Sequence, residues 1–322
     1  MSTVTTRIVL LVTSPRLPAG LLTAEAWDAV RTHPVFAGAE SAQADALRAN
    51  GVPVTVLDTD AQGLLDAIAG LPAAIWLAGP AGDQPFARQL GLRLAREPGL
   101  AELELMYGSW DPPGARLLDA VTVMDRLASP GGDPWKRAQT HRTLAPYLLE
   151  ESYEAYDAIV GDDLGALREE LGDVLLQVIL HARLAEDRDE SDRWTIDDVA
   201  GDLVDKMIRR NPHVFTDQRT EDIEEITANW ERIKREEKAR DSVLDGIALS
   251  QPALALAAKI LHRVERGALD VPLPAADGLG TVLLGVVAEA RAAGLDPEAE
   301  LRAATLSFAD AVRAAENVRS PE

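Results

Sequence analysis

Two short runs of acidic residues, each inside a segment with helical periodicity, constrain the fold of this chain most. The acidic residues are Glu150, Glu151 and Glu154 in the first run and Glu170 and Asp173 in the second. Residues three and four apart share one face of a helix, so each run presents its carboxylates in one direction. The intervening Gly161-Asp162-Asp163 turn predicts an antiparallel helix hairpin in which the two acidic faces meet.

Five opposed carboxylates repel one another unless a positive charge lies between them. A hard divalent cation that prefers oxygen ligands, such as Mg²⁺, is the natural candidate. We therefore predict that all five acids are catalytic and that four of them bind the metal: Glu151, Glu154, Glu170 and Asp173. The alternative is that they are rim residues of a bundle in an acidic protein, since the formal net charge is −21.

The segment 164–186 is apolar around most of its circumference, which predicts a helix buried on several sides. One polar stripe remains, formed by Glu170, Asp173, Gln177 and His181. A buried carboxylate needs a partner, and this favours a functional role for the stripe over a solvated face. We expect His181 to be structural, because no second histidine stands at metal-ligand spacing.

Composition excludes several classes of protein. The negative charge argues against a protein that wraps nucleic acid or binds an anionic membrane. The absence of cysteine rules out disulfides and thiolate metal sites. The apolar run Ile8–Val12 is too short for a signal sequence or a membrane span, so we expect a cytoplasmic protein.

Residues 1–118 have an α/β pattern. Short apolar runs bounded by Pro and Gly alternate with helical segments, which predicts a parallel sheet. The expected strands are Ile8–Val12, Val52–Leu57 and Ala74–Leu77, and the expected helices include Thr23–Thr32 and Ser41–Asn50.

The rest of the chain is predicted to be helical. The expected helices are Arg116–Leu127, Thr143–Val160 with Pro146 in its first turn, Leu164–Glu186, Thr195–Arg210 after a capping box, and Glu221–Ala239. The apolar frame of Leu171–Arg183 recurs in Leu279–Arg291 without the acids. Gly278 and Thr281 replace Glu170 and Asp173, which indicates a second unit that keeps the packing and lacks the chemistry.

Two basic clusters suit the binding of phosphates. They contain Lys206, Arg209 and Arg210 at the end of one helix, and Lys234 and Lys238 after Trp230 on the next. An aromatic ring beside cations could hold a base and its phosphates. The alternative for each cluster alone is ordinary: helix ends often carry Lys and Arg, and a lone Trp is usually core.

At this point the chain resembles a known family. Residues 119–262 resemble the MazG family of nucleoside triphosphate pyrophosphohydrolases, whose signature is E-E-x-x-E followed by E-x-x-D. Besides the five acids, the matching motifs are Pro134-Trp135, Gln139-Thr140, Arg209-Arg210-Asn-Pro-His213-Val-Phe215, Asn229-Trp230-Glu231-x-x-Lys234-x-x-Glu237-Lys238 and Gln251-Pro-Ala-Leu254.

The resemblance implies a homodimer of helical bundles that hydrolyses a range of nucleoside triphosphates to the monophosphate and diphosphate with Mg²⁺. It implies that Lys206 and Arg210 contact phosphates and that Trp230 lies near the base. The fold class is then a multidomain chain: an α/β domain (1–118), an all-α catalytic bundle (119–262) and a degenerate helical repeat (263–322).

Three departures from the family pattern stand out. Asp133-Pro-Trp-Lys136 replaces Cys-Pro-Trp-Asp, and the repeat has Ser307, Asp310 and Ala311 where phosphate-binding cations are expected. The N-terminal region resembles the tetrapyrrole methylase domain that is fused to MazG in some bacteria. The opening Ile8–Pro15 lacks the Gly-rich turn of a working S-adenosylmethionine site, so we expect a degenerate remnant.

Two other functions remain open at this level. One is a non-catalytic, nucleotide-binding regulatory bundle, which would bind nucleotide with metal and not turn it over. The other is a true methyltransferase, which would bind S-adenosylmethionine through residues 1–118.

Overall fold

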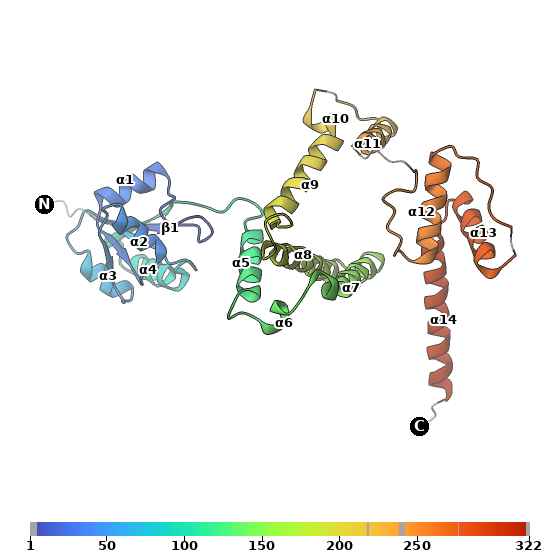
Figure 1. The fold of residues 1–322 in the computed structure, drawn as a ribbon. Coiled ribbons are helices and arrows are strands. Elements are labelled where there is room, and N and C mark those ends of the chain that lie inside the picture. The colour runs from blue at the N-terminus through green and yellow to red at the C-terminus, as the bar shows by residue number, and fades with distance from the viewer. Residues whose placement is uncertain (1–4, 218, 238–241, 276, 320–322) are drawn as a thin grey trace. The chain divides into compact units, whose positions relative to one another are not determined.

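The computed structural model describes residues 5–217, 219–237, 242–275 and 277–319. The chain divides into two compact units, Met1–Gly201 and Asp202–Glu322. The first unit contains a sheet with its helices and a helical part, and helices connected by loops make up the described part of the second (Figure 1). None of the described helices is long and apolar enough to cross a membrane.

A parallel sheet forms the middle of the N-terminal domain, as the sequence pattern predicts. Its five strands lie in the order β3-β2-β4-β1-β5. The strands are β1 (Thr6–Val12), β2 (Val35–Ala37), β3 (Val54–Val56), β4 (Ala73–Leu77) and β5 (Ala101–Tyr107). In the register of the sheet, Leu10 of β1 lies opposite Trp76 of β4 and Leu105 of β5.

Helices cover both faces of this sheet. Since side chains alternate along a strand, Ile8 packs into one core and Val9 into the other. Helices α1 (Ala24–Thr32) and α2 (Ala42–Ala49) cover the face of Val9, and α3 (Ala61–Ala67) and α4 (Gln84–Arg96) cover the face of Ile8. Hydroxyl groups cap the first two helices: Thr23 Oγ1 accepts from Ala26 N, and Ser41 Oγ accepts from Ala44 N.

The remainder of the first unit is helical. Its helices are α5 (Arg116–Ala128), α6 (Pro134–Arg137), α7 (His141–Val160) and α8 (Leu164–Glu186). Met124 of α5, Leu144 of α7, and Ile179 and Leu180 of α8 form a shared core. This core holds α5, α7 and α8 together.

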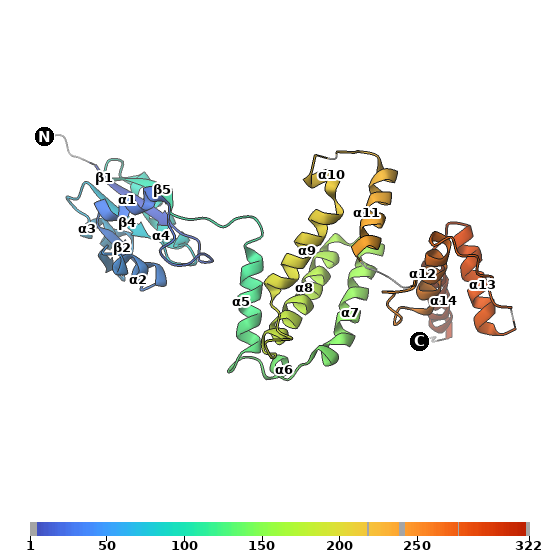
Figure 2. The same ribbon diagram turned by 45° about the horizontal axis from the view of Figure 1, so that its top comes forward.

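Helices α7 and α8 form the predicted hairpin and run side by side (Figure 2). Thr140 caps α7 in a capping box with Thr143, so the helix begins at His141 and Pro146 lies in its second turn, one turn later than expected. Asp163 caps α8 by accepting hydrogen bonds from Gly165 N and Ala166 N at 2.9 and 3.0 Å. These caps fix the start of each helix.

The burial of α8 differs from the prediction along its length. Ile179 and Leu180 are buried, but Leu171 is 52% exposed and Leu164 is 78% exposed. Ile179 and Leu180, in the second half of α8, share a core with Met124 of α5 and Leu144 of α7. The helix is therefore buried on several sides only in its second half.

The chain divides within α9 (Ile196–Arg210), a helix that begins after the predicted capping box of Thr195 and Asp198. The later helices are α10 (Pro212–Phe215), α11 (Ile223–Glu237), α12 (Ala253–Arg266), α13 (Leu279–Ala292) and α14 (Pro297–Arg319). Within the second unit, α12 packs against both α13 and α14.

Candidate active site

Three of the predicted carboxylates come together on the α7–α8 hairpin. Glu151 and Glu154 project from α7, and Glu170 projects from α8. One oxygen from each of the three lies within 4.8 Å of the other two, and Glu151 and Glu170 are partly buried. The opposed helical faces expected from the sequence therefore meet, and they meet at three of the five acids.

The other two acids flank this group. Asp173 lies one turn further along α8, partly buried, and its charge acts on both Glu151 and Glu170. Glu150 is exposed beside Glu151 on α7, and its charge also acts on Glu151. All five predicted residues thus contribute to one region of negative charge.

This environment disfavours ionisation of two of the acids, Glu151 and Glu170. Partial burial is the largest cause of a raised pKa for both Glu151 and Glu170. Negative neighbours add to it, Asp173 first for Glu151 and Glu154 first for Glu170. The donor set consists of hard carboxylate oxygens, which suits a divalent cation that prefers oxygen over nitrogen or sulfur. A bound cation would remove the repulsion.

The polar stripe on α8 continues away from the acids through Gln177 and His181. Gln177 is 4% exposed, and its Oε1 has no hydrogen-bond partner among the described residues. His181 is paired with His141, the first residue of α7, across 2.7 Å between their Nδ1 atoms. The two rings stack at 5.0 Å, and Trp194 stacks on His141 at 6.1 Å. A structural role for His181 is consistent with this pairing.

The histidine pair was not expected from the sequence, because its members are 40 residues apart. Two Nδ1 atoms at this distance share one proton, so one ring donates and the other accepts. Burial, followed by the nearby His141, lowers the pKa of His181. Burial and the neighbouring ring therefore favour the neutral form of His181.

The second unit contains most of the predicted nucleotide-binding residues. Arg209 and Arg210 at the end of α9 both pair with Glu237 at the end of α11. The guanidinium carbon of Arg210 lies 5.4 Å from the centre of the Trp230 ring, and Lys234 Nζ lies 4.5 Å from it. Two cations thus lie against one half-buried aromatic ring.

Glu237 is the residue of this cluster to which the sequence assigned no role. Hydrogen bonds from Arg210 and then Arg209 lower its pKa to about 2. Of the two remaining predicted cations, Lys206 is half-buried on α9, one turn before Arg210. Lys238 lies outside the described residues.

The Asp133-Pro-Trp-Lys136 segment has a local structural role. Asp133 Oδ1 accepts from Trp135 N at 3.0 Å and caps α6, and its other oxygen lies 3.3 Å from Lys136 Nζ. Trp135 packs edge-on against Tyr147 of α7 at 5.7 Å. The acidic residue in place of the family's cysteine is thereby explained as a helix cap.

The same region of the chain matches known proteins. A family model described as the MazG nucleotide pyrophosphohydrolase domain matches residues 139–215. The nucleoside triphosphate pyrophosphohydrolase of Escherichia coli is 43% identical over 182 residues, which are 55% of this chain and 68% of that protein. The protein of the same name from Mycobacterium tuberculosis is 45% identical over 203 residues, which are 63% of this chain and 59% of that protein.

A third relative is the nucleoside triphosphate pyrophosphohydrolase/pyrophosphatase MazG of Thermotoga maritima. It is 35% identical over 216 residues, which are 60% of this chain and 82% of that protein. The relatives from E. coli and T. maritima are thus each matched over more than two thirds of their own length. On this likeness, the chain belongs to the MazG family of nucleotide pyrophosphohydrolases.

Proposed function

We propose that the chain is an Mg²⁺-dependent pyrophosphohydrolase that converts nucleoside triphosphates of broad range to the monophosphate and diphosphate. The observation that carries this proposal is the carboxylate group of Glu151, Glu154 and Glu170 within 4.8 Å. The relatives named nucleoside triphosphate pyrophosphohydrolase support the choice of substrate.

In this proposal Glu151, Glu154, Glu170 and Asp173 hold the metal, with Glu150 beside them. When bound, Mg²⁺ would supply the positive charge that both the acids and the triphosphate require. Water adds at phosphorus and the P–O bond of the α–β anhydride breaks. One proton of the water passes to a carboxylate, and the monophosphate and diphosphate separate.

The cationic residues are assigned to the substrate. Lys206, Arg209, Arg210 and Lys238 would bind the phosphates, and Trp230 would lie against the base with Lys234 beside it. The ring contacts of Arg210 and Lys234 support this assignment, because they keep two cations beside an aromatic surface. Mutation of each residue in turn can separate those that contact the phosphates from those that contact the base.

Separation of the reaction products tests the activity. The full chain is incubated with Mg²⁺ and a panel of ordinary and oxidised nucleoside triphosphates. The products nucleoside monophosphate plus inorganic diphosphate are then separated from nucleoside diphosphate plus inorganic phosphate. Glu151→Gln and Asp173→Asn should abolish diphosphate release with circular dichroism unchanged, while Asp157→Asn on exposed α7 surface should not. Metal-dependent nucleotide binding without turnover in the unaltered protein would instead support the regulatory function.

We also propose a homodimer formed through the hairpin. Leu149 and Ile159 of α7 are 58% and 56% exposed, and Leu164 and Leu171 of α8 are exposed as well. Apolar side chains gathered on one helix pair favour burial against a second copy. Light scattering of the protein as it elutes from a sizing column measures the mass, and a monomer across the concentration range would exclude this proposal.

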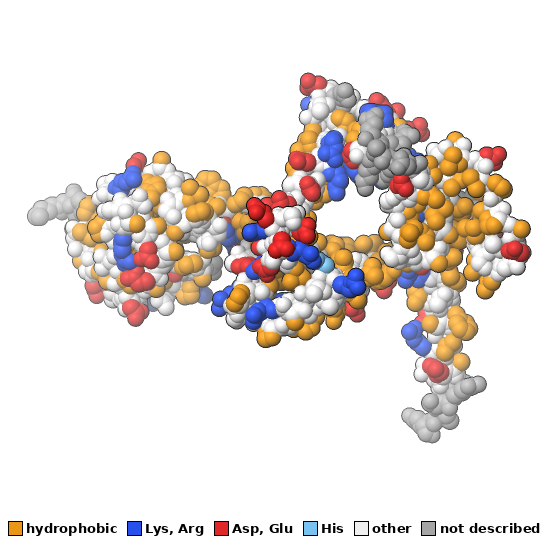
Figure 3. All heavy atoms as spheres, in the orientation of Figure 1, with side chains coloured by type: hydrophobic (Ala, Val, Ile, Leu, Met, Phe, Trp, Pro, Cys, Tyr) orange, Lys and Arg blue, Asp and Glu red, His pale blue; other side chains and the backbone are white. Residues whose placement is uncertain are grey.

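The C-terminal helices fit a degenerate repeat. Helix α13 begins at Leu279, and Thr281 Oγ1 accepts from Gly278 N at 3.1 Å, so the positions equivalent to Glu170 and Asp173 form a helix cap. Exposed apolar residues such as Leu279 and Val286 lie on this helix, and hydrophobic side chains gather over α12 and α13 (Figure 3). The boundaries 119–262 and 263–322 remain predictions, and α12 runs through residue 262.

A further inference from the structure

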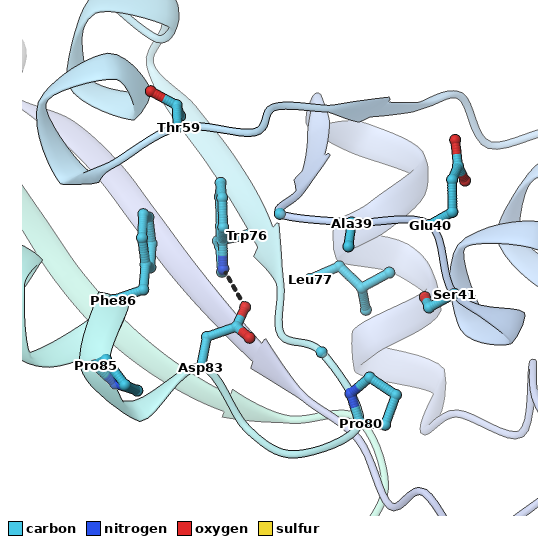
Figure 4. A pocket seen from close by; sticks show the side chains of 12 residues that line it. Ala39, Glu40, Ser41, Thr59, Trp76, Leu77, Pro80, Asp83, Pro85 and Phe86 are labelled. Atoms are coloured by element: carbon cyan, nitrogen blue, oxygen red, sulfur yellow. Dashed lines mark hydrogen bonds between the residues drawn. The ribbon is translucent and has the colours of Figure 1, made fainter.

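The α/β domain contains a pocket that the proposed function does not use. It opens at the carboxyl ends of β2 and β4, and its volume is about 360 Å³ (Figure 4). The turns that follow these two strands, from Gly38 to Ser41 and from Gly79 to Asp83, supply much of its wall. All of its lining residues belong to the α/β domain.

The strand order explains why a pocket forms here. Strands β2 and β4 are neighbours, yet the helices that follow them pack on opposite faces of the sheet: α2 on one and α4 on the other. The two connections therefore diverge and leave a crevice outside the strand ends. In open parallel α/β sheets, ligands bind at such a point of divergence.

The pocket has a firm aromatic wall. Trp76 Nε1 donates to Asp83 Oδ2 at 2.8 Å, and the Trp76 ring stacks on Phe86 at 4.0 Å with an angle of 12°. A Cβ on Gly38 would lie 3.3 Å from the Trp76 ring, so glycine permits the turn after β2 to approach Trp76 of β4 closely. The wall is thus held by packing and by a hydrogen bond.

The polar side chains that line the pocket are acids and hydroxyls. Glu40 and Asp83 provide carboxylates, and Ser41 and Thr59 provide hydroxyls. None of the described residues that line it is Lys, Arg or His. Glu40 pairs through both of its carboxylate oxygens with the Arg48 guanidinium, at 2.5 and 3.2 Å, so the charge of this cation is already neutralised. A triphosphate would therefore be disfavoured here.

We propose that this pocket binds a nucleoside that carries no phosphate. The volume falls in the range of ~300–1,000 Å³ that holds small ligands. The exposed apolar surface of Ala39, Pro80 and Pro85 suits a planar base, and Asp83 can accept hydrogen bonds from sugar hydroxyls and ring amino groups. The site is separate from the carboxylate group on α7 and α8.

Calorimetric titration of the full chain with adenosine, guanosine, cytidine and uridine tests the proposal. A chelator is present, so the proposed metal-dependent reaction contributes nothing. At least one nucleoside should bind, and its 5′-monophosphate should bind at least about tenfold more weakly, a difference of about 1.4 kcal/mol. Absence of binding by all four nucleosides, or equal binding of the monophosphate, overturns the proposal.

Variants at Ala39 locate the binding. Ala39 is exposed at the pocket, so Ala39→Leu fills the space while Ala39→Ser keeps it. The leucine variant should lose about tenfold or more in affinity, and the serine variant should stay within about twofold. Trp230→Ala should bind nucleoside as the parent does. If Trp230→Ala abolishes binding while Ala39→Leu retains it, the nucleoside occupies the other cluster and this proposal is wrong.

The two proposals fail separately. Circular dichroism and nucleoside triphosphate turnover of Ala39→Leu, with Mg²⁺ present, report whether the chain is intact. Absence of turnover in the parent protein would contradict the proposed activity and would leave the result of the nucleoside titration unaffected.

Discussion

Glu237 accepts hydrogen bonds from Arg210 Nε through both of its carboxylate oxygens, at 3.3 and 3.1 Å. The same carboxylate pairs with Arg209 at 2.6 Å, so one acid at the end of α11 positions two neighbouring cations at the end of α9. Arg210 also lies against Trp230, which links the ion pair to the aromatic ring. Glu237 is therefore a positioning residue for the proposed nucleotide contacts.

Replacing Glu237 by Gln should destabilise the second unit in a pH-dependent manner. The lowered pKa means that Glu237 stabilises the fold fully above its ordinary value of 4.5, and that this contribution is lost as the pH falls through about 2. The difference in urea midpoint between parent and variant should therefore be constant at neutral pH and shrink in strong acid. Glu289→Gln, an exposed change on α13, is the control and should show no such pH dependence.

Replacing Glu154 by Gln should raise the melting temperature in the absence of metal. The change removes a negative charge that raises the pKa of both Glu151 and Glu170. The gain should be a few degrees, since ~1 kcal/mol shifts the midpoint by ~2–4 °C in a domain of 150–250 residues. Differential scanning calorimetry at pH 7.5 with and without Mg²⁺ measures it.

The metal response gives the control for this experiment. Mg²⁺ should raise the melting temperature of the parent and of Asp157→Asn, and should raise that of Glu154→Gln less. A lower melting temperature for metal-free Glu154→Gln would mean that the carboxylate is a stabilising partner, and would contradict the assignment of the group as a cation site.

The sequence was sufficient to predict the helix hairpin and the meeting of its acidic faces. Helix α8 has the predicted bounds, Leu164 and Glu186, because an acidic cap and strong apolar periodicity mark its ends and its packed face. The meeting of Glu151 with Glu170 followed from helix spacing and a short turn alone. A helical period of three to four residues depends only on residues close in sequence, so this part of the fold could be predicted.

Two strands could not be identified from local patterns. Strand β2 has only three residues, Val35–Ala37, and is defined by its neighbours β3 and β4. Strand β5 alternates Glu and Leu, a composition that also suits a helix, and only its pairing with β1 shows it to be a strand. Contacts between distant segments, such as His141 with His181, likewise leave no local signal.

Replacing His181 by Gln should reduce the fall in melting temperature that the parent shows as the pH drops below neutral. The pKa of His181 is lowered, so the folded chain binds fewer protons there than the unfolded chain. This group's contribution is fully present above its ordinary pKa of 6.5 and falls as the pH drops below it. The melting temperature of the parent relative to the variant should therefore be lower at pH 5.5 than at pH 7.5.

A direct comparison of the two proteins at each pH is needed, because Glu151 and Glu170 act in the opposite direction. Their raised pKa values make the folded chain more stable as the pH falls. His33→Gln, on a loop after α1, provides the control. A parent–variant difference that does not change with pH would contradict the role of the histidine pair.

Two leucines on α8 should respond very differently to truncation. Leu180→Ala should cost ~2–5 kcal/mol, because the side chain is fully buried in the core shared with α5 and α7. Leu171→Ala removes a side chain that is 52% exposed and should cost well under ~1 kcal/mol in the isolated chain. Chemical denaturation at low protein concentration gives both values.

The same pair of variants reports on assembly. If a second copy covers the exposed part of α8, Leu171→Ala should lower the melting temperature more at high protein concentration than at low concentration. Leu180→Ala should show the same loss at both. Concentration-independent behaviour of Leu171→Ala would contradict burial of this position between copies.

Strand β5 forms one border of the sheet and pairs only with β1 among the described strands. Its outer side presents backbone donors and acceptors to any extended peptide, and exposed edge strands are common sites of aggregation. Exposed Glu102 and Glu104 alternate along it with apolar residues, and Glu104 pairs with Arg7 at 3.0 Å. Another copy of this strand would bring like charges together, so we expect the acidic residues at this border to disfavour pairing between copies.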